Sequence, residues 1–309
     1  MSDSGRRALD PILEKVLEAV PFELTTDGGA EAARVRFRAL PRKPVFPEVR
    51  AEDRVIDGVP VRIYSPPDIE PSAPVVLFFH GGGWVVGDLD TYDGTARTHA
   101  VGTGAVVVSV DYRLAPEHPY PAAVDDVWAV TQWVATHADE IGGDPNRIAV
   151  AGDSAGGNLA AVVAQLARDN GVTLRAQLLW YPATTWDTSL PSFKENADAP
   201  ILGRAAVGGF SLWYAEGVDL STAPATLIPA RAESLAGLAP AYIAVAGYDP
   251  LRDDGIRYGE LLTAAGVSAE VHQAQTLVHG YLGYHGVVPA ATAAVDQGLS
   301  ALRSALGSR

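Results

Sequence analysis

Short, unbroken apolar runs alternate with helical patterns over most of the chain from residue 75 onward. The apolar runs are residues 75–79, 105–110, 148–151, 177–180 and 242–246, and the helical patterns are residues 121–138, 155–168 and 251–265. An unbroken apolar run is typical of a strand that is buried on both faces, as in a parallel sheet. Because strands and helices take turns, the pattern predicts an α/β fold with a mostly parallel central sheet flanked by helices.

A β-hairpin is predicted to open this main domain, which we place at residues 46–309. Residues 49–56 and 59–64 have the composition of two extended segments, and Asp57-Gly58 joins them. That dipeptide favours the tight turn of a hairpin.

Two further segments do not follow the strand–helix pattern. Residues 1–45 hold an amphipathic helix near residues 11–20, a glycine-containing break, a second helical stretch through Arg38 and then prolines. Residues 184–230 hold Trp186, Phe193, Trp213 and Tyr214 among prolines and glycines, with no clear strand. We predict an N-terminal appendage and an insertion over the carboxyl edge of the sheet, where ligands bind in open α/β folds.

Composition narrows the chemistry and the partners. The 309 residues are 48% hydrophobic, enough for one large domain, and none is cysteine, which excludes disulfides, thiolate nucleophiles and cysteine-bound metals. A net charge of −14 repels nucleic acid and anionic membranes, so neither is an expected partner. Asp10, Glu14 and Lys15 interrupt the first apolar residues, and no apolar run reaches the ~18 residues of a membrane span. We expect a soluble, cytoplasmic protein.

The strongest chemical signal is Gly152-Asp153-Ser154-Ala155-Gly156. It lies between a predicted strand and an alanine-rich helical run. Gly-x-Ser-x-Gly in that context is typical of a nucleophile elbow, a turn so sharp that only glycine tolerates the close backbone contacts beside the serine. The pentapeptide also arises by chance in glycine-rich loops, but the flanking strand and helix favour Ser154 as a nucleophile.

A second signal follows the predicted strand 75–79 directly and reads His80-Gly81-Gly82-Gly83-Trp84. Consecutive glycines let backbone N–H groups point at one spot, which suits a developing oxyanion. The alternative of a phosphate-binding loop is disfavoured, because the G-x-x-x-x-G-K-[ST] motif is absent and no helical pattern begins directly after Trp84. The predicted oxyanion-hole donors are the N–H groups of Gly82, Gly83 and Ala155.

Residues 111–123 combine many prolines with charged side chains. This composition predicts a rigid, hydrogen-bonded loop that holds its neighbours in place. We therefore interpret His118 as structural rather than catalytic. His99 and His137 are interpreted as solvated helix residues.

An elbow serine needs a carboxylate and a histidine, in the chain order Ser, Asp or Glu, His. Asp249 lies just after the predicted strand 242–246. Asp253 and Asp254 fall in the next helical pattern, where acidic residues of a first turn ordinarily interact with the helix dipole. The predicted carboxylate is therefore Asp249.

Three histidines follow Asp249. His272 lies in the alternating pattern of residues 269–275, which predicts a strand, and His285 lies near the last helix. His279 comes after that strand, in a loop beside a glycine. We predict His279 as the base that serves Ser154.

Taken together, these motifs resemble the bacterial hormone-sensitive-lipase-like esterases, also called family IV, of the α/β-hydrolase superfamily. The resemblance covers roughly residues 50–300 and is closest to the subgroup with Gly-Asp-Ser-Ala-Gly around the serine. The chain departs at Tyr281, where phenylalanine is common after the His-Gly pair. The resemblance implies an α/β-hydrolase fold with a helical cap, built from residues 1–45 and the insertion at 184–230.

The resemblance also implies a carboxylesterase that hydrolyses short-to-medium acyl esters through a Ser-His-Asp triad and an acyl-enzyme, with no metal or organic cofactor. A homodimer is expected through edge strands near residues 269–275, because an open sheet leaves an edge unpaired. The residues expected to line the substrate pocket are Trp84, Trp186, Phe193, Trp213 and Tyr214.

Two other functions stay open at this point. Plant gibberellin receptors resemble the same family and bind a small molecule without hydrolysing it, but they lack the catalytic histidine, whereas His279 stands in its motif here. A hydrolase of the same fold that acts on amides, lactones or carbamates uses the same tetrahedral chemistry, so the triad alone does not separate it from an esterase.

Overall fold

The structure, a computed structural model, describes residues 7–307. Within these residues one eight-stranded sheet has the order β1-β2-β4-β3-β5-β6-β7-β8. The first two neighbouring pairs in this order are antiparallel and all the others are parallel, which confirms the predicted sheet. The strands are β1 (Arg50–Ile56), β2 (Val59–Ser65), β3 (Ala73–Phe79), β4 (Val106–Val110), β5 (Gly143–Asp153), β6 (Ala176–Trp180), β7 (Ala241–Tyr248) and β8 (Ala269–Val278).

The predicted hairpin is confirmed. Ile56 pairs with Val59 at its closed end. Asp57 and Gly58 have φ angles of 48° and 84°, and two consecutive positive values match the twist of the flanking strands.

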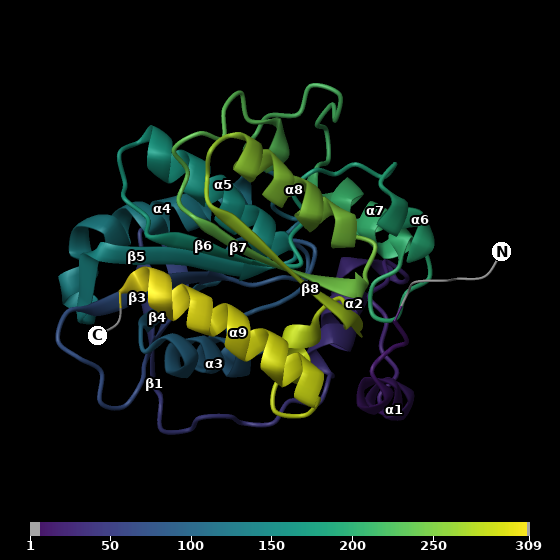
Figure 1. Cartoon of the computed structure of the whole chain (residues 1–309), viewed down its shortest axis with the longest axis horizontal. Helices are drawn as coiled ribbons and strands as arrows, with labels where there is room; N and C mark the ends of the chain where they lie inside the picture. Colours follow the sequence, from purple (N-terminus) through teal and green to yellow (C-terminus); the bar gives the residue numbers. More distant parts are fainter. Residues whose placement is uncertain (1–6, 308–309) are drawn as a thin grey trace.

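Two layers of helices cover the sheet (Figure 1). On one face lie α3 and α9, and on the other lie α4, α5 and α8. Every residue of β3 and β4 is buried, as expected for strands covered on both faces. The bounds of these helices are α3 (Asp93–Thr103), α4 (Ala122–His137), α5 (Ala155–Asp169), α8 (Arg252–Ala264) and α9 (Pro289–Leu306), with short 3-10 segments at Ala138–Ile141, Pro229–Arg231 and Tyr281–Tyr284.

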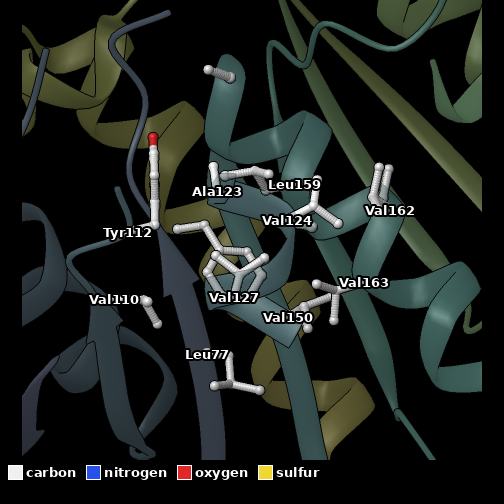
Figure 2. Packing of buried hydrophobic residues seen from close by; sticks show 14 of the residues in the cluster. Leu77, Val110, Tyr112, Ala123, Val124, Val127, Val150, Leu159, Val162 and Val163 are labelled. Carbon is white, nitrogen blue, oxygen red and sulfur yellow. The ribbon is translucent and has the colours of Figure 1, made fainter. Parts of the chain in front are cut away.

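Figure 2 shows how branched side chains fill the space between the sheet and its helices. Leu77 and Val150 project from neighbouring strands toward Val127 of α4 and Val163 of α5. All four are fully buried. This packing fixes α5 against the centre of the sheet, and α5 begins directly after the elbow serine.

The remaining helices gather beyond the carboxyl ends of the strands (Figure 1). The helices α1 (Pro11–Ala19) and α2 (Gly29–Arg38) come from the N-terminal segment, while α6 (Pro191–Glu195) and α7 (Arg204–Tyr214) come from the segment after β6. Glu23 and Ile201 join the two segments in a parallel bridge, and Leu24 N donates to Ile201 O at 2.8 Å. Residues 1–6 of the predicted appendage lie outside the described residues.

Candidate active site

The carboxyl ends of the parallel strands bring the predicted chemical groups to one edge of the sheet. Ser154 follows β5, Asp249 follows β7 and His279 follows β8. The glycine loop after His80 follows β3. Residues far apart in the chain therefore meet at this edge.

Ser154 sits in a sharp, strained turn between β5 and α5. Its φ of 55° and ψ of −115° lie in a region that residues with a side chain rarely adopt. A Cβ at Gly156 would lie 1.9 Å from the carbonyl oxygen of Phe79, and one at Gly152 would lie 2.2 Å from that of Gly156. Only glycine fits at these two positions, as the elbow motif predicts.

The three predicted triad residues form one hydrogen-bonded line. His279 Nε2 lies 2.9 Å from Ser154 Oγ, and His279 Nδ1 lies 2.7 Å from Asp249 Oδ2. Because a carboxylate accepts from Nδ1–H, Nε2 of the neutral ring is left to accept from the serine hydroxyl. All three side chains are buried, and Leu251 N–H donates to the other carboxylate oxygen of Asp249 at 2.8 Å.

The two other acidic candidates, Asp253 and Asp254, bind groups other than His279, and their role goes beyond an interaction with the helix dipole. Asp254 is buried and accepts from the N–H and hydroxyl of Thr184, each at 2.6 Å, and from Thr185 N–H at 2.8 Å. Asp253 accepts from Ser192 N–H and pairs with Arg252. Both aspartates thus anchor the segment after β6 to the body, a role that the sequence pattern did not indicate.

The remaining histidines separate clearly from the triad. His272 lies in β8, as predicted, and His285 pairs with Asp296 at 3.0 Å. His118 and His137 are exposed, the latter at the end of α4. The prediction for His99 was wrong, because its ring is fully buried between α3 and the sheet and accepts a hydrogen bond from Trp180 Nε1.

The loop after β3, named the oxyanion loop for its predicted role, has a strained backbone. Gly82, Gly83 and Trp84 have φ angles of 107°, 59° and 60°, so three consecutive residues are left-handed. A Cβ at Gly82 would lie 2.2 Å from the carbonyl oxygen of Val86, which excludes any side chain there. Ala155, the third predicted donor, begins α5 and is buried. The role of the three N–H groups in binding an oxyanion stays a prediction.

Asp153, beside the nucleophile, connects this loop to the elbow. Its carboxylate accepts from Gly81 N–H at 2.8 Å and from Tyr92 O–H at 3.1 Å. Burial raises the pKa of this carboxyl to about 6, although the hydrogen bonds from Gly81 and Tyr92 act in the opposite direction. Asp153 was not among the predicted site residues, and its acidic side chain inside the elbow motif was the available signal.

The loop of residues 111–123 holds its neighbours, as predicted. Tyr112 O–H donates to the carbonyl of His80 at 2.7 Å, and the two rings stack with centroids 4.3 Å apart. Arg113 holds Asp126 of α4 at 2.7 Å. The loop therefore fixes the start of the oxyanion loop from one side.

Aromatic rings gather around Trp84, at the end of the glycine loop. The indole of Trp84 stacks flat on Tyr214, with centroids 4.2 Å apart, and lies 5.6 Å from Trp186. Trp213 packs edge-on against Phe210, and a Cβ at Gly83 would lie 2.9 Å from the Phe210 side chain. Phe210, which was not among the predicted pocket residues, thus contacts the loop directly.

Within the described residues, Trp213 pairs with Phe210 and not with the other predicted pocket rings, and Phe193 pairs with none of them. Phe193 lies half-buried in α6, and within residues 7–307 no ring pair joins it to the other four predicted aromatics.

The same part of the chain holds no group of three or more His, Asp or Glu side chains placed to bind a metal ion. None of its helices is both long enough and apolar enough to cross a bilayer.

Comparison with known proteins connects this geometry to a family. Residues 76–283 match the family model described as the alpha/beta hydrolase fold. Esterase LipI of Mycobacterium tuberculosis is 66% identical over 306 residues, which cover 97% of this chain and 96% of LipI. Carboxylesterase NlhH of the same organism is 56% identical over 312 residues, which cover 98% of each chain.

A solved structure agrees in fold over nearly the whole chain. The crystal structure of DphMB1 has 78% sequence identity and a TM-score of 0.96, covering 97% of this chain and 100% of that one. With an elbow serine, a histidine and an aspartate meeting at the sheet edge, the family match explains the observed site. The chain belongs to the bacterial hormone-sensitive-lipase-like esterases of the α/β-hydrolase superfamily.

Proposed function

We propose that this protein is a serine carboxylesterase in which Ser154 is the nucleophile, His279 the general base and Asp249 the carboxylate that orients the base. The observation that carries the proposal is the hydrogen-bonded line from Asp249 through His279 to Ser154, with distances of 2.7 and 2.9 Å. The relatives named esterase and carboxylesterase, which match along nearly their whole length, support the same reaction.

The first half-reaction forms an acyl-enzyme. Ser154 Oγ attacks the ester carbonyl while its proton passes to Nε2 of His279, and Asp249 stabilises the imidazolium that results. The carbonyl oxygen becomes an oxyanion, which the N–H groups of Gly82, Gly83 and Ala155 bind. Nε2 then gives its proton to the departing alcohol as the C–O bond breaks.

The second half-reaction returns the enzyme to its starting state. A water molecule takes the place of the alcohol and loses a proton to Nε2 of His279 as it attacks the acyl carbon. Collapse of the second oxyanion breaks the bond to Ser154 and restores its proton. The triad needs no metal or organic cofactor for either half.

The substrate proposed is an ester with a short-to-medium acyl chain. Trp84, Trp186, Trp213 and Tyr214 supply large apolar faces beside the oxyanion loop, with Phe210 added from α7. Rigid stacked rings favour a pocket of limited depth, which a short acyl chain fills. Phe193 is left out of this set.

A helical cap is proposed from residues 1–45 and 184–230, over a catalytic domain of residues 46–309. The bridge between Glu23 and Ile201 supports it, because it ties two segments that are distant in sequence. A Cβ at Gly209 of α7 would lie 2.5 Å from the side chain of Thr26, which indicates close packing of the two parts. Deleting residues 7–45 is expected to expose the site to solvent and to lower the rate on every ester.

A homodimer through β8 is part of the proposal. The strand β8 ends the strand order of the described sheet, so no further strand pairs with its outer edge there, although Asp10 N–H donates to the Thr276 carbonyl at 3.0 Å. Light scattering is expected to give twice the chain mass of 32.4 kDa at micromolar concentration. A mass of one chain would contradict it.

We also propose that the protein binds no nucleic acid and is located in the cytoplasm. The net charge of −14 supports an absence of binding to nucleic acid, which a gel-shift assay at low salt checks. A location in the cytoplasm is to be checked by fractionation of the source cells.

The central experiment replaces the nucleophile. Ser154→Ala is expected to lower kcat by about a million-fold, the usual cost of losing a triad serine, while the melting temperature stays close to that of the wild type. Rates on a matched ester, amide and lactone then separate the esterase from other hydrolases of the fold. A Ser154→Ala protein that keeps several per cent of its activity would place the nucleophile elsewhere.

A further inference from the structure

The oxyanion loop combines backbone strain with a need for accurate geometry. Trp84 holds a left-handed φ of 60° directly after two left-handed glycines. A residue with a side chain stays in that region only where its surroundings hold it there. The contacts on either side of the loop therefore decide where the N–H groups of Gly82 and Gly83 point.

One side of the loop is held from the elbow. The Asp153 carboxylate accepts from Gly81 N–H at 2.8 Å, so the residue before the two glycines is fixed relative to Ser154. The other side turns back on itself, because Val85 and Val86 N–H both donate to the carbonyl of Gly82, at 3.1 and 3.0 Å. Hydrogen bonds that the carbonyls of Trp84 and Val85 accept fix that turn relative to the rest of the protein.

Those two carbonyls are held by a closed ring of hydrogen bonds that includes the cap helix α2. The Trp84 carbonyl accepts from Ala115 N–H at 2.8 Å. Arg34 of α2 donates from Nε to the Val85 carbonyl and from Nη2 to the Ala115 carbonyl, both at 2.9 Å. Its Nη1 donates to Glu117 at 2.9 Å. One guanidinium thus binds the oxyanion loop and the loop of residues 111–123 together.

The chemistry of this contact suits arginine alone. The Arg34 side chain is 13% exposed and both Val85 and Ala115 are fully buried, so the bonded carbonyls have little access to water. A planar fork with five N–H donors reaches three acceptors on two segments at once, whereas a lysine ammonium is a single point donor on a flexible stem. Glu117 is 55% exposed and keeps the fork oriented from the solvent side.

We propose that Arg34, in the N-terminal segment, is a positioning residue for catalysis: it holds the Val85 carbonyl and thereby aims the N–H groups of Gly82 and Gly83 at the oxyanion. The proposal rests on the proposed function, since it needs an oxyanion at Ser154. It gives the cap a part in the chemical step in addition to covering the site.

Arg34→Lys tests the proposal because it keeps the positive charge beside Glu117 and removes only the fork. A displaced oxyanion donor costs up to about 100-fold in rate. We expect kcat on p-nitrophenyl butyrate to fall about 10-fold for Arg34→Lys and about 100-fold for Arg34→Ala, with KM within about twofold of the wild type.

Arg38→Lys is the matched control, with the same substitution one helical turn further along α2. Arg38 pairs with Asp88 at 2.9 Å and is itself 55% exposed. Its variant is expected to keep kcat within about twofold, because a surface ion pair contributes little to stability and Arg38 is not bonded to the oxyanion loop carbonyls. An equal loss of kcat in both variants would assign the effect to cap docking and overturn the proposal.

Binding of a transition-state analogue supplies a second measurement. An aryl trifluoromethyl ketone forms a hemiketal with Ser154 whose oxygen occupies the oxyanion position. Its Ki is expected to rise across the Arg34 variants by the same factor as kcat/KM falls. An unchanged Ki alongside a reduced kcat would contradict the proposal.

Failure of this inference is distinguishable from failure of the proposed function. Labelling with a fluorophosphonate reports whether Ser154 is the nucleophile. If Ser154 is labelled and Ser154→Ala is inactive, while Arg34→Lys keeps full kcat, only the inference about Arg34 fails. If Ser154→Ala stays active, the proposed function itself fails.

Discussion

The indole N–H of Trp180 in β6 donates to Nε2 of His99 in α3 across 3.0 Å of buried space. Because Nε2 accepts, the ring proton is on Nδ1, which donates to the Thr95 carbonyl at 2.8 Å. His99 is therefore neutral and has partners on both nitrogens. Burial lowers the pKa of His99 to about 4.

This pair predicts how stability falls in acid. The unfolded chain binds a proton at His99 with an ordinary pKa of about 6.5, whereas the folded protein binds it only near pH 4. The contribution of neutral His99 to the free energy of unfolding is therefore complete above pH 6.5 and is lost as the pH falls toward 4. His99→Gln keeps an acceptor and a donor but does not titrate. Its free energy of unfolding is expected to fall by about 2 kcal/mol less than that of the wild type between pH 7 and pH 5.

Urea unfolding at the two pH values measures this difference. His137→Gln is the control, because His137 is exposed at the end of α4 and its variant should follow the wild type. Equal losses in the wild type and in His99→Gln would show that the Trp180–His99 bond does not govern the acid response.

Activity should depend on one histidine of the last three. His279→Ala is expected to lose almost all of kcat, at least about 10,000-fold, because it removes the base from Ser154. His272→Ala and His285→Ala should keep most of the rate, since these side chains lie in β8 and beside Asp296. Steady-state rates on p-nitrophenyl acetate compare the three, and an inactive His272→Ala would assign the base to β8.

Asp254 should matter more for stability than its place in a first helical turn suggests. Asp254→Ala leaves the buried donors of Thr184 and Thr185 without their acceptor and is expected to cost at least about 3 kcal/mol in the free energy of unfolding. Trp186, two residues beyond Thr184, should lose its fixed position, so KM should rise as well.

Chemical denaturation with a surface variant as control tests the Asp254 prediction. Glu260→Ala, on the same helix, removes only an exposed pair with Arg257 and should change stability by less than about 0.5 kcal/mol. Similar small effects for both variants would mean that the segment after β6 is held in another way.

Acyl-chain preference should peak at C8 or shorter, without activation at a lipid interface. Each added methylene helps by about 0.8 kcal/mol only until the pocket beside Trp84 and Tyr214 is full. A series of p-nitrophenyl esters from acetate to palmitate, compared as kcat/KM below the solubility limit, measures the preference. Trp186→Ala should move the maximum to a longer chain by removing one wall. A wild-type maximum at C12 or longer, or a jump in rate on emulsification, would contradict the prediction.

Local patterns along the chain were enough for the fold class and for predicting Ser154, Asp249 and His279, which the structure brings into hydrogen-bond contact. The apolar runs marked strands because a strand covered on both faces has few positions that suit a polar side chain. The elbow could be recognised in the sequence because both of its glycines are required by close backbone contacts. A side chain at Gly152 would clash with the carbonyl of Gly156, and one at Gly156 would clash with the carbonyl of Phe79 at the end of β3. Asp249 and His279 were readable because parallel strands end at one edge.

Tertiary structure alone decided which polar groups are buried and what they bind. His99 looks solvated in the sequence because its helix has a mixed composition, and only packing against Trp180 gives it a partner. Asp254 reaches Thr184 across 70 residues of chain, and Arg34 reaches Val85 across 51. The physical reason is that a hydrogen bond depends on the distance between two groups in space and not on their separation along the chain. A local pattern therefore shows that a side chain is polar but not which distant group it binds.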